Sequence, residues 1–178
     1  MSYFINFLTL SRIFLGAIIF ALLTRPEGYL LAFILFFVAG GTDYFDGYLA
    51  RKYNLTSQIG EILDPIADKI LIVFVLFGLS VNLTSYFIAF MASLIITREI
   101  WVGALRDFNA RQGRSGATKV TFLAKIKTTI QLFTITIYLL GLTLNNMLLI
   151  LFGDMFLFLS LLITIYTGYI YTYNSFKN

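Results

Sequence analysis

Apolar residues in this chain fall in runs of about 20, the length that an α-helix needs to cross a hydrocarbon layer roughly 30 Å thick. Of its 178 residues, 59% are hydrophobic and only 12% are charged, whereas a water-soluble domain carries about a quarter charged residues. This pattern excludes a water-soluble globule, a disordered chain and a fibrous protein. It predicts an all-α, polytopic membrane protein that forms a bundle of six transmembrane helices in a single domain, residues 1–178.

The six predicted spans cover residues 4–24, 30–50, 62–81, 84–106, 119–142 and 147–171. Arg12 and the lack of a small-residue cleavage site indicate that the first span is not a cleaved signal peptide. Positive charges concentrate in two connections, 51–58 and 107–118, while the other three connections contain one in total. Because cytoplasmic loops carry the excess of Lys and Arg, we expect both basic loops and both termini in the cytoplasm.

Composition also limits the chemistry that is possible. The chain contains no cysteine and no histidine, which excludes disulfides, thiolate ligands, imidazole ligands and histidine bases. Any catalysis must therefore use carboxylates, lysine, arginine, hydroxyls and metal ions. The net charge of +4 is explained by membrane topology, so we expect no nucleic-acid partner.

Five of the nine acidic residues lie between positions 43 and 68. Asp43 and Asp46 are three residues apart at the cytoplasmic end of the second span, and Asp64 and Asp68 are four apart at the start of the third. Both spacings place the paired side chains on one helix face. Two antiparallel neighbours would then direct four carboxylates into one cavity, and four carboxylates stay ionised together only with cations. Oxygen ligands favour Mg²⁺, Mn²⁺ or Ca²⁺, and paired ions are a recurrent device for phosphoryl displacement.

Small residues accompany these acids. Gly47 and Ala50 lie on the face of Asp43, and Gly60 lies one turn before Asp64. They are either packing contacts between membrane helices or positions where a ligand reaches the backbone. Arg51 is suited to a phosphate, and a positive-inside anchor is the alternative for it.

Together these residues form the pattern Asp43-x-x-Asp46-Gly47-x-x-Ala50-Arg51, eight residues, Gly60-x-x-x-Asp64-x-x-x-Asp68. The pattern resembles the signature of the CDP-alcohol phosphotransferase family without a departure. The segment from Asn6 to Arg12 is similar to the family's N-terminal segment, although Ile5 stands where a proline is frequent. Segments 97–99, 104–106 and 125–131 resemble the bacterial branch that joins CDP-diacylglycerol to sn-glycerol 3-phosphate and releases CMP.

The resemblance implies a role for each matching position. Asp43, Asp46, Asp64 and Asp68 would hold two divalent cations, Mg²⁺ or Mn²⁺, and Asp68 would also act as the base that accepts the hydroxyl proton. The CDP-diacylglycerol pocket would be formed by Asn6, Thr9, Gly47, Ala50, Arg51, Ser57 and Gly60. The resemblance also implies a homodimer in the bacterial inner (cell) membrane, among membrane lipids, with the active site facing the cytoplasm.

The acceptor is a dianion, so its recognition requires fixed positive charge. The candidates on the fourth and fifth spans are Arg106, Lys127, Arg98 and Lys125. Lysines inside a span are costly unless they face a partner or water, and a snorkelling anchor is the alternative for each. Lys125 and Lys127 cannot share one helix face, and either Glu99 or the acids of the aspartate motif are competing partners for Arg98.

Other functions remain open at this point. A different member of the same family would make cardiolipin, phosphatidylserine or a phosphatidylinositol phosphate. A cation transporter would also carry membrane acids, but these acids cluster at one membrane face and no polar residues continue across the bilayer. A non-catalytic scaffold would leave the complete motif unexplained. Asp154 lies in the sixth span, away from the motif, where packing is as reasonable as function.

Overall fold

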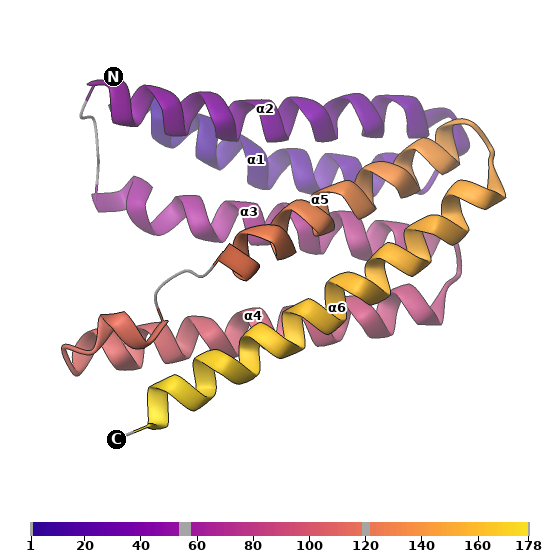
Figure 1. Ribbon diagram of the computed structural model, residues 1–178. Coiled ribbons are helices and arrows are strands. Elements are labelled where there is room, and N and C mark those ends of the chain that lie inside the picture. Colours follow the sequence, from indigo (N-terminus) through magenta and orange to yellow (C-terminus); the bar gives the residue numbers. More distant parts are fainter. Residues whose placement is uncertain (1, 54–57, 119–121, 178) are drawn as a thin grey trace. The chain divides into compact units, whose positions relative to one another are not determined.

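The computed structural model describes the backbone of residues 2–53, 58–118 and 122–177, and side chains within these ranges other than those of 2–8, 43–53, 58–62, 64, 65, 115 and 117. The described chain folds into six α-helices with two short 3-10 turns and contains no strand (Figure 1). In chain order the elements are α1 (Ser2–Leu23), η1 (Pro26–Gly28), α2 (Tyr29–Tyr53), α3 (Gln58–Asn82), α4 (Tyr86–Arg111), η2 (Ser115–Thr118), α5 (Phe122–Thr143) and α6 (Met147–Phe176).

Each predicted span corresponds to one observed helix, which confirms the all-α prediction. The largest differences are at the ends of α4 and α6, which reach residues 111 and 176 rather than 106 and 171. A hydropathy pattern marks where a helix leaves the hydrocarbon, whereas the helix itself continues until its last carbonyls find other partners. The predicted start of the fifth span at residue 119 lies outside the described residues.

The C-termini of α3, α4 and α5 share one backbone arrangement. After α4, Gly113 has a φ of 70°, its N–H bonds the carbonyl of Ala110, and the N–H of Arg114 bonds the carbonyl of Asn109. This pair of bonds is a Schellman motif, which satisfies the last carbonyls of a helix. Asn145 and Thr84, with φ of 49° and 45°, occupy the equivalent position after α5 and α3.

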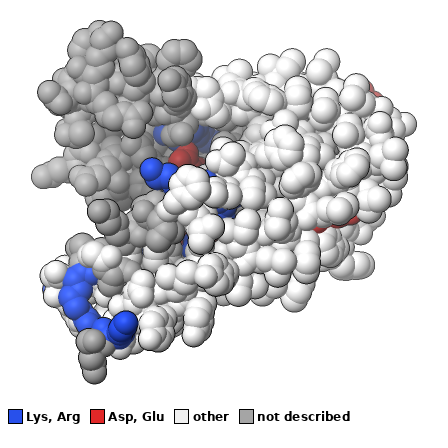
Figure 2. Space-filling model, in the orientation of Figure 1, with Lys and Arg blue, Asp and Glu red and all other residues white. Residues whose placement is uncertain are grey.

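Among the residues that the structure describes, the helices α4, α5 and α6 are long and apolar enough to cross a membrane. Over the described residues, α1 and α2 contribute shorter apolar stretches, 9–23 and 26–42. Most of the visible described surface carries no charged residue (Figure 2), as expected of helices that face lipid. The chain is therefore an all-α, multi-pass membrane protein.

The chain divides into two compact units, one of residues 1–85 and 139–146 and the other of residues 86–138 and 147–178. In the first unit, α1 packs against both α2 and α3. Close approach to α3 depends on Gly16 and Gly78, because a Cβ on Gly16 would lie 3.3 Å from Leu71 and one on Gly78 would lie 2.9 Å from Leu23. Residues later in α1 contact residues later in α3, so the two helices run parallel. This is the expected arrangement for two spans that are separated by a third span of opposite direction.

At the far end of this unit, one side chain joins three helices. The side-chain amide of Asn82, the last residue of α3, donates hydrogen bonds to the Leu23 carbonyl (2.6 Å) and to the Tyr29 hydroxyl (2.7 Å). Leu23 ends α1 and Tyr29 begins α2. This contact fixes the turn between α1 and α2 against the end of α3.

In the second unit, α4 packs against α6 and η2 packs against both. Trp101 donates to Thr172 (2.9 Å), and Asn109 donates to Ser175 (2.7 Å) in a buried contact. Residues later in α4 contact residues later in α6, so the two helices run parallel. The intervening helix α5 must therefore run in the opposite direction. The alternating up-and-down order of the predicted spans is thus met in each unit.

Candidate active site

The aspartate motif, residues 43–68, spans the end of α2 and the start of α3. Because both segments are helical, the three-residue spacing of Asp43 and Asp46 and the four-residue spacing of Asp64 and Asp68 place each pair on one helix face. The side chains of Asp43, Asp46 and Asp64 lie outside the described residues. Asp68 is the member of the motif whose contacts are described.

Asp68 forms an ion pair with Arg12 across the α1–α3 interface. The Arg12 side chain is fully buried, whereas the Asp68 side chain is 48% exposed. A buried guanidinium in an apolar helix needs a polar or charged partner, and Asp68 supplies one while about half of its side-chain surface stays exposed. The arrangement suits a carboxylate that is oriented by the protein and still accessible to a reactant.

The predicted nucleotide pocket is described at one position only. Thr9 is fully buried on α1, three residues before Arg12, so the two lie on neighbouring turns of the same face. The remaining predicted residues lie outside the residues whose side chains are described: Asn6, Gly47, Ala50, Arg51, Ser57 and Gly60.

Among the residues that the structure describes, no group of three or more acids forms a metal site. Three of the four predicted ligands fall outside that set, so the two-cation site stays a prediction. The donor chemistry still fits it, because the motif offers only carboxylates, and hard oxygen donors are the ligands that Mg²⁺ and Mn²⁺ accept.

A charged network connects the helices of the second unit. Glu99 on α4 accepts hydrogen bonds from its neighbour Arg98 (2.9 Å) and from Lys127 on α5. The three side chains are 20%, 10% and 7% exposed, respectively. Charges so far from water are costly without partners, and here two cations share one carboxylate. The predicted competition of Glu99 for Arg98 is confirmed.

Arg98 also bonds α6 at two places. Its Nε donates to the Thr164 carbonyl (2.9 Å), and its Nη2 donates to the Thr167 hydroxyl (2.6 Å). Gly168 makes room for the side chain, since a Cβ there would lie 3.1–3.2 Å from the Cγ and Nε of Arg98. We call Arg98, Glu99, Lys127, Thr164 and Thr167 the Arg98 network.

The four cations predicted to bind the acceptor phosphate therefore lie in different environments. Lys127 is buried and Lys125 is exposed, which confirms that the two lysines occupy different helix faces. Arg106 is exposed, and its Cζ lies 6.0 Å from the centre of the Tyr171 ring, while the Cζ of Arg98 lies 5.8 Å from the same ring. Both distances are within the range of a cation–π contact.

Sequence reasoning missed several polar residues of this unit. Thr164, Thr167 and Tyr171 recur every three or four residues on the buried face of α6, and this spacing is the signal that could have found them. Within the described chain, the Gln131 amide nitrogen and the hydroxyls of Ser160 and Thr164 are buried without a hydrogen-bond partner. Such groups cost about 1–3 kcal/mol each when unpaired.

Asp154 has a structural partner. The Tyr138 hydroxyl on α5 donates to Asp154 on α6 at 2.6 Å. Tyr138 is fully buried and its ring packs directly on Gly153, where a Cβ would lie 2.7 Å from the ring. The packing role considered for Asp154 is therefore the one that these contacts support.

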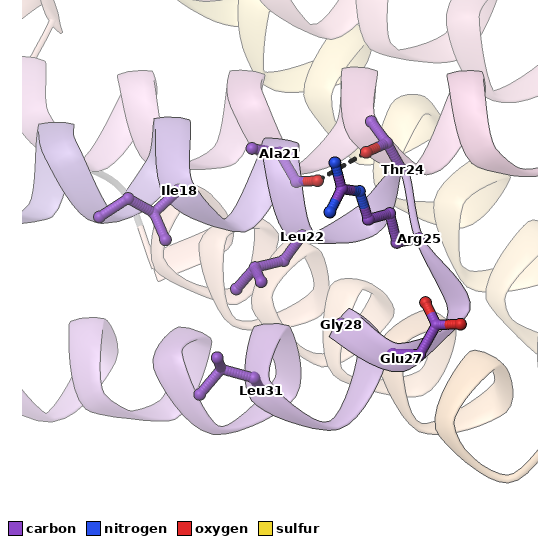
Figure 3. Close-up of a pocket in the computed structure, with 8 residues that line it drawn as sticks. All are labelled: Ile18, Ala21, Leu22, Thr24, Arg25, Glu27, Gly28 and Leu31. Atoms are coloured by element: carbon purple, nitrogen blue, oxygen red, sulfur yellow. Dashed lines mark hydrogen bonds between the residues drawn. The ribbon is translucent and has the colours of Figure 1, made fainter.

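A pocket of about 740 Å³ lies between the end of α1 and the start of α2, away from the aspartate motif (Figure 3). Ile18, Leu22 and Leu31 form its apolar side, and the exposed charges of Arg25 and Glu27 stand at the turn. Along α2, Asp43 is 12 residues beyond Leu31, or about 18 Å at 1.5 Å per residue. This pocket does not belong to the predicted active site.

Comparison with known proteins gives a consistent result. The model of the family described as CDP-alcohol phosphatidyltransferase matches residues 4–166. A protein of Rickettsia bellii (strain RML369-C), named CDP-diacylglycerol–glycerol-3-phosphate 3-phosphatidyltransferase, is 40% identical over 93% of this chain and 91% of its own. Proteins of the same name from Blochmanniella floridana and Rickettsia typhi (strain ATCC VR-144 / Wilmington) are 35% and 37% identical, over 94% and 93% of this chain and 88% and 93% of their own.

Proposed function

The chain belongs to the CDP-alcohol phosphatidyltransferase family, and from that premise we propose that it transfers a phosphatidyl group from CDP-diacylglycerol to sn-glycerol 3-phosphate. The products are phosphatidylglycerophosphate and CMP, in the synthesis of anionic phospholipids. The observation that carries the proposal is the name shared by relatives that are 35–40% identical over more than nine-tenths of the chain. The complete aspartate motif inside the matched region supports it.

In the proposed reaction, an oxygen of the acceptor attacks the phosphorus that carries diacylglycerol. The new P–O bond forms as the bond to the CMP oxygen breaks, and the hydroxyl proton passes to the Asp68 carboxylate. The half-exposed position of Asp68 and its orientation by Arg12 support this role. A general base at hydrogen-bond distance contributes about 10²–10⁴-fold in rate.

Two divalent cations, Mg²⁺ or Mn²⁺, are proposed to be held by Asp43, Asp46, Asp64 and Asp68. When bound, they would neutralise the diphosphate and stabilise the departing CMP. Helical spacing within each Asp pair and an all-oxygen donor set support this assignment. The proposed CDP-diacylglycerol pocket consists of Asn6, Thr9, Gly47, Ala50, Arg51, Ser57 and Gly60.

Positive charge on α4 and α5 is proposed to bind the acceptor phosphate. The four candidates are Arg106, Lys127, Arg98 and Lys125, and the Arg98 network holds two of them, Arg98 on α4 and Lys127 on α5, largely away from water. Buried cations in a membrane protein mark a binding site or pathway more often than a structural feature.

We further propose that the whole chain, 1–178, works as one catalytic domain and as a homodimer. Its place would be the bacterial inner (cell) membrane, with the active site facing the cytoplasm. The basic connections between α2 and α3 and after α4 support this orientation.

The test is CMP release by purified protein supplied with CDP-diacylglycerol and one acceptor at a time. We expect activity with sn-glycerol 3-phosphate and none with glycerol, serine, inositol phosphate or phosphatidylglycerol. Preference for any of the last three would assign the chain to another branch of the family. Absence of CMP release with every acceptor would contradict the enzyme proposal itself.

The metal proposal has a separate test. EDTA should abolish CMP release, and Mg²⁺ or Mn²⁺ should restore it. Single Asp→Ala changes at the four positions should abolish activity in folded protein and weaken Mn²⁺ binding measured by electron paramagnetic resonance. More than a few per cent of wild-type activity in any two variants would contradict the two-cation site.

A further inference from the structure

We propose that Glu99 is a positioning residue that holds the Lys127 ammonium for the acceptor phosphate, and that Arg98 acts through Glu99 instead of contacting the acceptor. This inference rests on the proposed function, because it gives Lys127 a phosphate to bind. It also separates the four candidate cations. Arg98 is anchored to α6, Lys127 is oriented by Glu99, and Arg106 and Lys125 are exposed.

Arg98 is already engaged at every nitrogen of its guanidinium. Nε bonds the Thr164 carbonyl, Nη2 bonds the Thr167 hydroxyl and Nη1 bonds Glu99. Its stem lies against the backbone at Gly168. These bonds use three of its five N–H donors and the side chain is only 10% exposed, so the geometry favours an anchor over a ligand.

Thr167 makes this contact specific for arginine over lysine. Its hydroxyl donates to the carbonyl of Ile163 in its own helix (2.8 Å) and accepts from Arg98 at 2.6 Å. The single O–H of the hydroxyl is used within α6, which leaves its oxygen to accept. A guanidinium fork fits the Thr164 carbonyl and the Thr167 hydroxyl together, whereas a lysine ammonium on its flexible stem offers no such fork.

Glu99 connects the anchor to Lys127 through one carboxylate oxygen, Oε1, which accepts from both cations. Without the negative charge of Glu99, the two cations Arg98 and Lys127 would repel each other with no carboxylate between them. With Glu99 ionised, two cations and one carboxylate leave a net charge of +1, which an anionic ligand can neutralise. The Lys127 ammonium carries three N–H donors, so it can bond Glu99 and a phosphate together.

The experiment measures the KM for sn-glycerol 3-phosphate and the KM for CDP-diacylglycerol in Arg98→Gln, Glu99→Gln and the double variant. We expect each single change to raise the acceptor KM about 10-fold and the double change to raise it no further, since residues that act in series are not additive. The donor KM should stay within about twofold of wild type.

Two conservative changes separate an anchor from a ligand. Arg98→Lys keeps the charge and loses the fork, so we expect it to behave like Arg98→Gln. Thr167→Val removes one contact of Arg98 and should raise the acceptor KM about two- to fivefold, with no further rise when it is combined with Arg98→Gln. Ser175→Ala is the matched control: it removes a buried α4–α6 hydrogen bond outside the network and should leave both KM values unchanged.

Folding is checked for each variant by gel filtration and thermal unfolding in detergent. If Arg98→Gln does not fold, Thr167→Val, Glu99→Gln and their double variant provide an equivalent double-mutant cycle. Roughly 100-fold loss in the double variant, equal changes in both KM values, or a wild-type acceptor KM in Arg98→Lys would each overturn the positioning role. Failure of the wild type to use sn-glycerol 3-phosphate would contradict the proposed function instead, so the two failures are distinguishable.

Discussion

Arg12 and Asp68 form an ion pair in which the guanidinium is fully buried and the carboxylate is half exposed. The pair joins α1 to α3, and it links the N-terminal segment of the chain to the last aspartate of the motif. Under the proposed function, in which Asp68 is the general base, we expect both stability and catalysis to depend on this contact, so a change at Arg12 should affect both.

We expect Arg12→Gln to lower the free energy of unfolding by about 1–3 kcal/mol, less than for a fully buried pair because water screens Asp68. It should also lower the kcat for CMP release about 10- to 100-fold, since Asp68 loses its orienting partner. Arg12→Lys keeps the charge and should lose less of both. A wild-type kcat in Arg12→Gln, with the protein folded, would contradict the role given to the pair.

The Tyr138–Asp154 bond should matter for stability and not for activity. Tyr138→Phe leaves the Asp154 carboxylate without its donor, which costs about 1–3 kcal/mol. Asp154→Asn retains an acceptor for the tyrosine and should cost less. Thermal unfolding in detergent measures both, and CMP release at a temperature where both variants are folded should equal that of the wild type. A selective loss of activity in Tyr138→Phe would show that the pair belongs to the site.

Gly28 should tolerate no side chain. A Cβ at this position would lie 2.3 Å from the Leu22 carbonyl oxygen, and a backbone atom cannot move away as a side chain can. We expect Gly28→Ala to destabilise the protein by about 1–3 kcal/mol. Gly40→Ala on α2 is the control, because a Cβ there meets nothing within 4 Å and alanine favours the helix. Equal unfolding temperatures for the two variants would disprove the steric argument.

Membrane orientation can be tested with single cysteines, because the chain has none of its own. Gln112→Cys lies in the basic connection after α4, and Asn146→Cys lies in the opposite turn between α5 and α6. In right-side-out spheroplasts, an impermeant maleimide should label Asn146→Cys and should reach Gln112→Cys only after permeabilisation. Asn54→Cys in the first basic connection should behave like Gln112→Cys. The reverse pattern would invert the topology.

The positions of all six helices could be predicted from sequence because each is an apolar run bounded by polar residues or turn formers such as Asn145 and Gly113. The helix ends were less predictable, since a Schellman motif depends on backbone φ and not on hydropathy. Thr84 shows this well: a β-branched residue with positive φ is not suggested by any turn preference.

The candidate site likewise has a part that could be predicted from the sequence and a part that could not. The acidic motif and the basic residues of α4 and α5 are visible in the sequence because charges stand out in apolar helices. Their partners are not, since Arg98 and Thr164 are 66 residues apart and Arg12 and Asp68 are 56 apart. Small hydroxyl residues such as Thr167 look like ordinary packing until a neighbouring helix places a guanidinium beside them.

Asn82 gives the fold an order of assembly. The residue that closes the turn between the first two helices is the last residue of the third, 53 positions beyond Tyr29. A nascent chain that has inserted only α1 and α2 cannot yet make this contact, so the turn between these helices lacks two hydrogen bonds until α3 has been synthesised. Once Asn82 is in place, its two hydrogen bonds join α3 to both earlier helices, and an error in the insertion of α3 would leave the first hairpin without them.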